Sequence, residues 1–233
     1  MLSYDSFTLE RAIFELRFHA GYLYWDNCGK IWCILSEKWP NLSMGKVDTS
    51  QANFQLDDND IHLSFSYNRF GVHQDYPKKR DFFPRFTDES SQVILEYLQI
   101  NTFTRIGNRY QYMSGVDDID EVTKLLVDRG LFNISSKMEN LGKKISEPNI
   151  KFLIEKNDIS ITVRIGYVKR ELEFSVPKPL KVDESAFIKQ GISVDLDFFT
   201  TKPVDRGILN VADLITTHQR SSRLQPIKEV PET

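Results

Sequence analysis

The stretch Ile61-His62-Leu63-Ser64-Phe65-Ser66-Tyr67 alternates apolar and polar residues without a break. A period of two sends successive side chains to opposite faces of a β-strand. Because the polar positions are rich in hydroxyl groups, we expect one face of this strand to meet water and the other to be buried. A strand with one wet and one buried face is typical of an antiparallel sheet. The stretch therefore predicts such a sheet.

The same alternation recurs along the chain. It predicts strands over residues 14–18, 103–113, 159–165, 172–176 and 192–198. Asn157 and Asp158 have the chemistry of a turn before the strand at 159–165. The segment Tyr76-Pro77-Lys78-Lys79-Arg80 combines proline with charge, which argues against a central strand there.

Helices are predicted from apolar spacings of three and four residues and from capping side chains. Their expected starts are residue 29, Thr87, Asp118 in a capping box with Glu121, and Asn210 with Asp213. Pro40 stops the first helix and begins a polar connection, whereas Gly130 ends the third as a left-handed cap.

These elements predict an α+β fold. The strands pair locally and no repeated strand-helix-strand crossover occurs, so a mixed, mostly antiparallel sheet with helices packed on one face is expected. Two halves of similar size are suggested, an N-terminal one over residues 1–132 and a C-terminal one over residues 149–227. A polar linker separates them, and a single continuous domain remains the alternative.

Composition limits the classes of partner. The 233 residues are 40% hydrophobic and 12% aromatic, which is enough for a folded core. The 30 Lys and Arg against 33 Asp and Glu give a net charge of −3, so the molecule as a whole has no strong attraction to phosphate backbones or anionic membranes. The sequence has no apolar run of about 20 residues and no basic, apolar leader, and we expect a cytoplasmic protein.

No cofactor or structural metal is expected from the sequence. Cys28 and Cys33 are too few for a disulfide framework or a closed zinc site, and no Walker A or dinucleotide-binding glycine motif occurs. The histidines are scattered without a metal-binding spacing, at His19, His62, His73 and His218. No residue is assigned a catalytic role, and the balance is against an enzyme.

Three segments together resemble a known family. They are Ala12-Ile13-Phe14-Glu15-Leu16-Arg17-Phe18, Arg105-Ile106-Gly107-Asn108-Arg109-Tyr110 and Val194-Asp195-Leu196-Asp197-Phe198, with Leu214 and His218 in the last helix. They resemble a sporadically distributed prokaryotic family of proteins of about 250 residues with no assigned activity. The resemblance implies a bacterial protein, sometimes encoded within mobile or defence-related gene clusters, and implies no catalytic residue.

Two charged pairs are candidate site residues. Arg105 and Arg109 lie an even number of residues apart, so both guanidinium groups emerge on one strand face, with Gly107 leaving space between them. They could grip an anion. The alternative is that they form ion pairs with Asp195 and Asp197, which share a strand face, and this structural interpretation is favoured. Asp195 and Asp197 are also weak candidates for a metal site of the kind found in nucleases.

Aromatic and basic residues gather in two other places. The segment 78–86 carries Lys78, Lys79, Arg80 and Arg85 with Phe82, Phe83 and Phe86, a mixture that could bind single-stranded nucleic acid. Burial of the phenylalanines is favoured, with an exposed one as a protein anchor the next possibility. Trp25 and Trp32 form a second aromatic group, also with core favoured. Phe82, Phe83, Trp25 and Trp32 are therefore the candidates for partner binding.

The leading hypothesis is a non-catalytic adaptor that acts with a protein partner encoded beside it, possibly an accessory component of a bacterial defence or toxin-antitoxin system. One alternative is a nucleic-acid-binding component that uses Arg105, Arg109 and the basic residues of segment 78–86. Another is a metal-dependent nuclease centred on Asp195 and Asp197. The sequence leaves the identity of the partner and the oligomeric state open.

Overall fold

The computed structural model describes residues 6–79, 81–116, 118–131, 145, 147–171 and 188–222. The strands are β1 (Thr8–Phe18), β2 (Leu42–Val47), β3 (Gln51–Leu56), β4 (Ile61–Ser66), β5 (Arg69–Asp75), β6 (Thr102–Gly115), β7 (Asn149–Lys156), β8 (Ile159–Glu171), β9 (Ile188–Thr200) and β10 (Val204–Asp205). The helices are α1 (Tyr24–Lys38), α2 (Phe82–Tyr97), α3 (Ile119–Asp128) and α5 (Val211–Ser222). No helix in the described part of the chain is long and apolar enough to cross a membrane.

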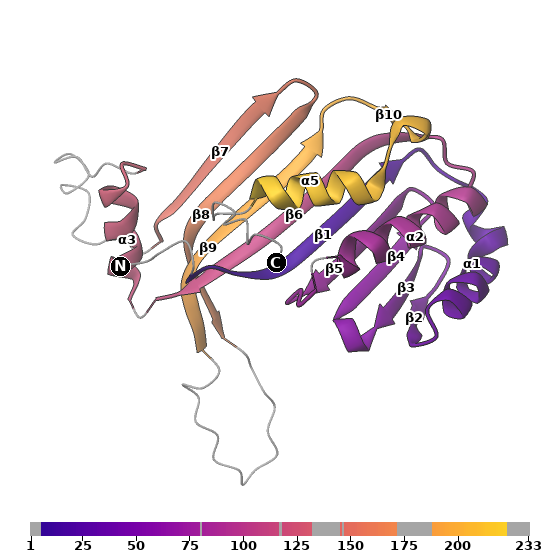
Figure 1. Cartoon of the computed structure of the whole chain (residues 1–233), viewed down its shortest axis with the longest axis horizontal. Helices are drawn as coiled ribbons and strands as arrows, with labels where there is room; N and C mark the ends of the chain where they lie inside the picture. Colours follow the sequence, from indigo (N-terminus) through magenta and orange to yellow (C-terminus); the bar gives the residue numbers. More distant parts are fainter. Residues whose placement is uncertain are drawn as a thin grey trace, which may run out of the picture.

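One ten-stranded sheet forms the centre of the fold. Its order is β2-β3-β4-β5-β1-β6-β9-β8-β7, and β10 pairs with β6 (Figure 1). Neighbouring strands are antiparallel throughout. The predicted α+β class with mainly antiparallel strands is therefore confirmed. The three segments that carry the family resemblance lie in β1, β6 and β9, which are consecutive strands of the sheet.

Most of the predicted elements are present. β1, β6, β8 and β9 contain the strands predicted at 14–18, 103–113, 159–165 and 192–198, and β4 covers the predicted strand 61–67 up to Ser66. The Asp118 carboxylate accepts a hydrogen bond from the Asp120 amide at the start of α3, and Asn210 does the same for Asp213 at α5. Gly130 has a φ of +67°, the left-handed conformation expected at the end of α3. The strand predicted over residues 172–176 lies outside the described residues.

Several boundaries differ from the prediction. The expected polar connection after Pro40 contains a hairpin, β2 and β3. β7 lies at the start of the predicted C-terminal half, where no strand was predicted. β5 is a central strand that begins at Arg69, where no strand was predicted. Thr87 does not cap α2, because that helix starts at Phe82 and Thr87 is fully buried inside it. α1 also begins earlier than expected, at Tyr24.

The core lies between the sheet and its helices. Figure 1 shows α1, α2 and α5 laid across one face of the sheet. Alternate strand residues such as Phe14, Leu63 and Val72 are buried beneath them. α3 packs farther along, where Val122 and Leu126 meet Ile192. We call the opposite side of the sheet the open face, since no helix of the described residues packs on it.

The contacts of β6, β9 and α5 join the two stretches that the sequence suggested as halves. β6, from residues 1–132, pairs along its length with β9, from residues 149–227. The buried Tyr110 hydroxyl donates to the Ile215 carbonyl at 2.9 Å, and His218 stacks on Phe198 with ring centroids 4.7 Å apart. Both stretches therefore contribute to one sheet and one main core.

Candidate functional site

Asp195 is the centre of a charged cluster on the open face. It lies on β9, and its side chain is only 10% exposed. Arg109 of β6 donates two hydrogen bonds to it, Nε to Oδ1 at 2.7 Å and Nη2 to Oδ2 at 2.6 Å. Arg164 of β8 donates a third, from Nη1 to Oδ2 at 3.0 Å. One buried carboxylate thus holds two guanidinium groups from the strands on either side.

A second cluster follows along the same face. Arg105 donates to Glu15 of β1 at 2.9 Å and to Asp197 of β9 at 3.4 Å. Its guanidinium lies over the Phe199 ring and passes so close to Gly107 that a Cβ there would be 3.0 Å from Nη1. Burial raises the pKa of Asp197, and the nearby positive charges of Arg105 and Arg109 oppose that rise.

The four charged candidates of β6 and β9 are therefore brought together, in the pairing that the ion-pair interpretation predicts. Both carboxylate oxygens of Asp195 already accept hydrogen bonds from arginines. A metal ion bound there would share the carboxylate with two guanidinium groups, whose positive charges would oppose its binding. Charged networks of this kind hold neighbouring strands in register.

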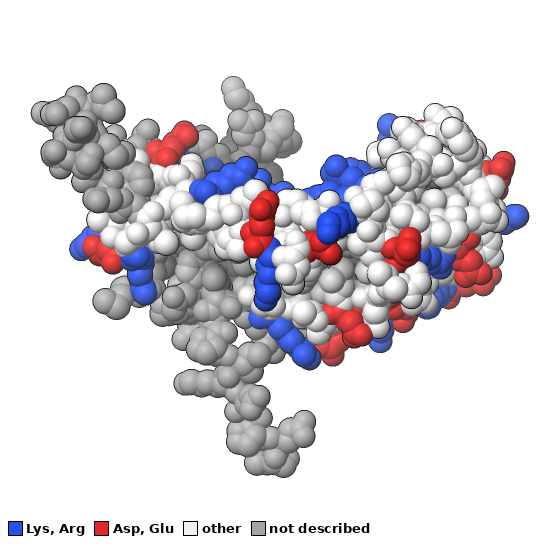
Figure 2. All heavy atoms as spheres, turned by 90° about the horizontal axis from the view of Figure 1, so that it is seen from above, with Lys and Arg blue, Asp and Glu red and all other residues white. Residues whose placement is uncertain are grey.

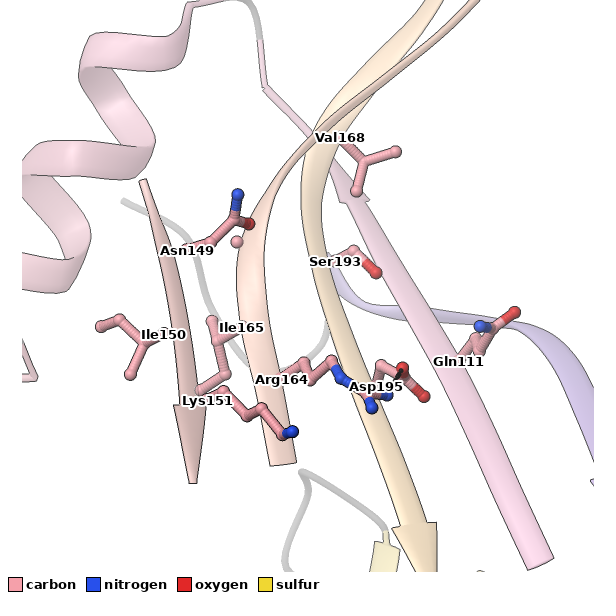
Figure 3. Close-up of a pocket in the computed structure, with 10 residues that line it drawn as sticks. Gln111, Asn149, Ile150, Lys151, Arg164, Ile165, Val168, Ser193 and Asp195 are labelled. Carbon is pink, nitrogen blue, oxygen red and sulfur yellow. Dashed lines mark hydrogen bonds and ion pairs between the residues drawn. The ribbon is translucent and has the colours of Figure 1, made fainter. Parts of the chain in front are cut away.

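A hollow of about 330 Å³ lies beside Asp195, between β6, β9, β8 and β7 (Figure 3). The polar side chains that line it are Gln111, Asn149, Lys151, Arg164, Ser193 and Asp195. Lys151 stands directly opposite Arg164 in the β7–β8 register. Two like charges facing each other across strands are unfavourable. Arg164 has Asp195 as its partner, whereas Lys151 has none among the residues that the structure describes.

β7 forms the edge of the sheet next to this hollow. It pairs with β8 and, within the described ranges, with no other strand. Three consecutive apolar side chains at its centre are exposed, Phe152 by 39%, Leu153 by 56% and Ile154 by 50%. Because successive residues of a strand point to opposite faces, this run makes both sides of the edge apolar. β7 was not predicted from the sequence. The turn at Asn157 and Asp158 is the feature that indicates a strand before β8.

The candidates for partner binding are dispersed. Phe83 is buried in the core, which removes it as a surface anchor, while Phe82 and Trp32 are half-buried against Trp39 and Phe54. Trp25 is 51% exposed. It stacks between Tyr22 and Tyr67, with ring centroids 6.1 Å away on each side, so core placement does not hold for this residue.

The basic candidates do not form one surface. Lys78 and Lys79 are exposed in the loop between β5 and α2, and Arg80 lies outside the described residues. Arg85 is on α2, where its guanidinium stacks on Trp39 and Phe82 at 5.6 and 5.7 Å. Arg105 and Arg109 lie on the other side of the sheet from that helix. Figure 2 shows basic and acidic side chains lying next to one another across its view of the molecule.

Two histidines that look scattered in the sequence are neighbours in space. His62 of β4 and His73 of β5 are directly opposite each other, and their rings stack with centroids 4.6 Å apart. Burial, and then the proximity of His62, lowers the pKa of His73. Asp75 lies two residues farther along β5 on the same face, and its carboxylate is bound by Arg11.

Comparisons with known proteins do not indicate a function. The chain matches no described protein family and no curated protein sequence. The resemblance to the sporadically distributed prokaryotic family therefore stays a prediction that rests on the motifs in β1, β6 and β9.

Proposed function

We propose that this protein is a non-catalytic binding protein that holds a protein partner through the outer edge of β7. The observation that carries the proposal is the exposed run Phe152, Leu153 and Ile154 on a strand that pairs, within the described residues, on one side only. The family resemblance adds a context, in which a neighbouring gene encodes the partner and the pair belongs to a bacterial defence or toxin-antitoxin system.

The edge of β7 is suited to strand addition. An edge strand presents unpaired N–H and C=O groups, and an extended segment of another chain can pair with them. Natural proteins usually protect such edges with proline, charge or short length. β7 spans eight residues. It has no proline, and its apolar centre is uncharged between Lys151 and Glu155.

The charges beside the edge suggest what the partner segment contains. Lys151, Arg164 and Arg109 lie at or beside the hollow, against the carboxylate of Asp195 and that of the nearby Asp197. An acidic side chain from the added strand would relieve the repulsion between Lys151 and Arg164. We therefore propose an extended, mainly apolar partner segment with an acidic residue placed near Lys151.

Nucleic-acid binding has weaker support. It would need a continuous basic surface, because affinity for a phosphate backbone comes from several cations acting together. Arg105 and Arg109 are engaged with carboxylates, and Arg85 lies on the opposite side of the sheet. The excess positive charge around the hollow is the observation in its favour.

The test is affinity purification of the full chain from its native host, with three single variants compared with the parent. Leu153→Lys places a charge in the apolar run, and Lys151→Glu reverses the charge at the hollow. Met44→Lys is the matched control, because Met44 is 50% exposed on β2 at the other edge of the same sheet. Circular dichroism checks that each variant folds.

We expect one protein at fixed stoichiometry with the parent and with Met44→Lys. Leu153→Lys should weaken its binding at least about tenfold, since charged edge residues oppose strand addition. Lys151→Glu should weaken it as well. Equal retention by Leu153→Lys would overturn the proposal. So would co-purified nucleic acid that is lost steeply as salt rises, or a dimer of this chain that Leu153→Lys dissociates.

A further inference from the structure

The open face carries another group of polar side chains, separate from the clusters around Asp195 and Arg105 and far across the sheet from β7. His62 and His73 form a directly opposed pair in the β4–β5 hairpin, and Asp75 follows two residues after His73. The metal-binding atoms of the three side chains lie within 4.8 Å of one another, and all three residues are half-buried. This group plays no part in the proposed partner site.

We propose that His62, His73 and Asp75 form a binding site for a divalent transition-metal ion, with Zn²⁺ as the representative ion. Two imidazole nitrogens and one carboxylate oxygen are a ligand set typical of Zn²⁺, Fe²⁺ and related ions. Mg²⁺ and Ca²⁺ prefer ligand sets made of oxygen atoms. Three protein ligands leave coordination positions for water or for a group from a binding partner.

The β4–β5 hairpin brings the two rings together, with their centroids 4.6 Å apart. A neutral imidazole is the form that binds a metal. The backbone of the hairpin fixes both residues, so the site needs little ordering when the ion binds.

Arg11 orients the third ligand. Its guanidinium, from β1, donates to both oxygens of the Asp75 carboxylate, one of these bonds being Nη2 to Oδ2 at 3.1 Å. Each carboxylate oxygen has a second lone pair, so the group can bind a metal ion while it holds Arg11. An outer partner of this kind fixes the direction of a metal-bound carboxylate.

The test uses the full chain after removal of metals with a chelator. Titration calorimetry with ZnCl₂ measures stoichiometry and affinity for the parent, His62→Gln, His73→Gln and the control His19→Gln. His19 is an exposed histidine outside the group. Absorption spectra with Co²⁺ exclude binding by Cys28 and Cys33, because nitrogen and oxygen ligands give no thiolate-to-metal charge-transfer band.

We expect one Zn²⁺ per chain in the parent and in His19→Gln. His62→Gln and His73→Gln should each weaken binding at least about 100-fold, because loss of even an outer partner of a ligand costs about 10-fold to 100-fold. If a variant fails to fold, NMR of the parent decides, since Zn²⁺ should shift the imidazole resonances of His62 and His73 and leave those of His19 and His218 unchanged. No binding of Zn²⁺ by the parent, undiminished affinity in both folded variants, or a thiolate band with Co²⁺ would overturn the site.

Discussion

At the scale of single residues, Asp195 is a buried charged group that requires partners. Its side chain is 10% exposed and its two oxygens accept three hydrogen bonds from Arg109 and Arg164. A buried carboxylate is tolerated only when it is paired and hydrogen-bonded. The guanidinium groups of Arg109 and Arg164 both hydrogen-bond to this carboxylate. Removing its charge should therefore weaken the attachment of β6 and β8, the strands that flank β9.

Asp195→Asn should therefore destabilise the protein by about 1–2 kcal/mol, since it leaves two guanidinium groups unpaired whose 37% and 46% exposure lets water screen part of the charge. The change keeps the shape of the side chain and removes its charge. Denaturation in urea measures the free energy of unfolding.

Asp158→Asn is the control for this prediction. Asp158 pairs with Lys202 at 2.7 Å, but the two side chains are 64% and 72% exposed. Its loss should cost less than about 1 kcal/mol. A cost for Asp195→Asn as small as that of the control would show that the cluster does not stabilise the sheet.

At the scale of elements, the junction of β6 and β9 permits no side chain at Gly191. This residue faces Gly115 in the register, and a Cβ at position 191 would lie 2.2 Å from the Ser114 carbonyl oxygen. That oxygen belongs to the backbone, so it cannot move aside as the end of a side chain would. The close approach of the two strands at this point therefore depends on glycine.

Gly191→Ala should cost about 1–3 kcal/mol of stability through displacement of one strand. Gly29→Ala is the matched control, because Gly29 lies in α1 with nothing within 4 Å of the added Cβ. Alanine there should increase stability by about 0.5–1 kcal/mol, because it reduces the entropy lost on helix formation. Thermal unfolding of both variants measures the difference, and a neutral Gly191→Ala would contradict the packing described for this junction.

At the scale of the whole molecule, the sheet joins the stretch over residues 1–132 to the stretch over residues 149–227, so the stability of each depends on the other. β6 pairs with both β1 and β9, and α5 covers the β6–β9 junction through Tyr110 and Phe198. Neither stretch has a separate main core among the described residues. We therefore expect cooperative unfolding in place of two independent transitions.

The position of the tryptophans allows a direct test of whether unfolding is cooperative. Trp25, Trp32 and Trp39 all lie in or next to α1, so their fluorescence reports on the first stretch alone. Far-ultraviolet circular dichroism reports on the whole molecule. In urea the two signals should have the same midpoint. Midpoints that clearly differ would show that the stretches unfold separately.

The sequence by itself determined where β1, β4, β6, β8 and β9 lie and which face of each of these strands is buried. It also contained the registers of two hairpins, β4–β5 and β7–β8, which were not predicted. His62 and His73 are equidistant from the turn at Tyr67 and Asn68, and Lys151 and Arg164 are equidistant from the turn at Asn157 and Asp158. A hairpin fixes its register by its turn, so these pairs could have been predicted from the sequence.

Only the tertiary structure decided which distant strands became neighbours. The sequence suggested that Arg105 and Arg109 pair with Asp195 and Asp197, but alternation does not say that β9 lies beside β6 or that Arg164 shares Asp195. It also does not say that β7 ends the sheet with Leu153 exposed. The physical reason is that periodicity reports the face of a residue, whereas the order of strands depends on how all the apolar faces of the chain are buried together.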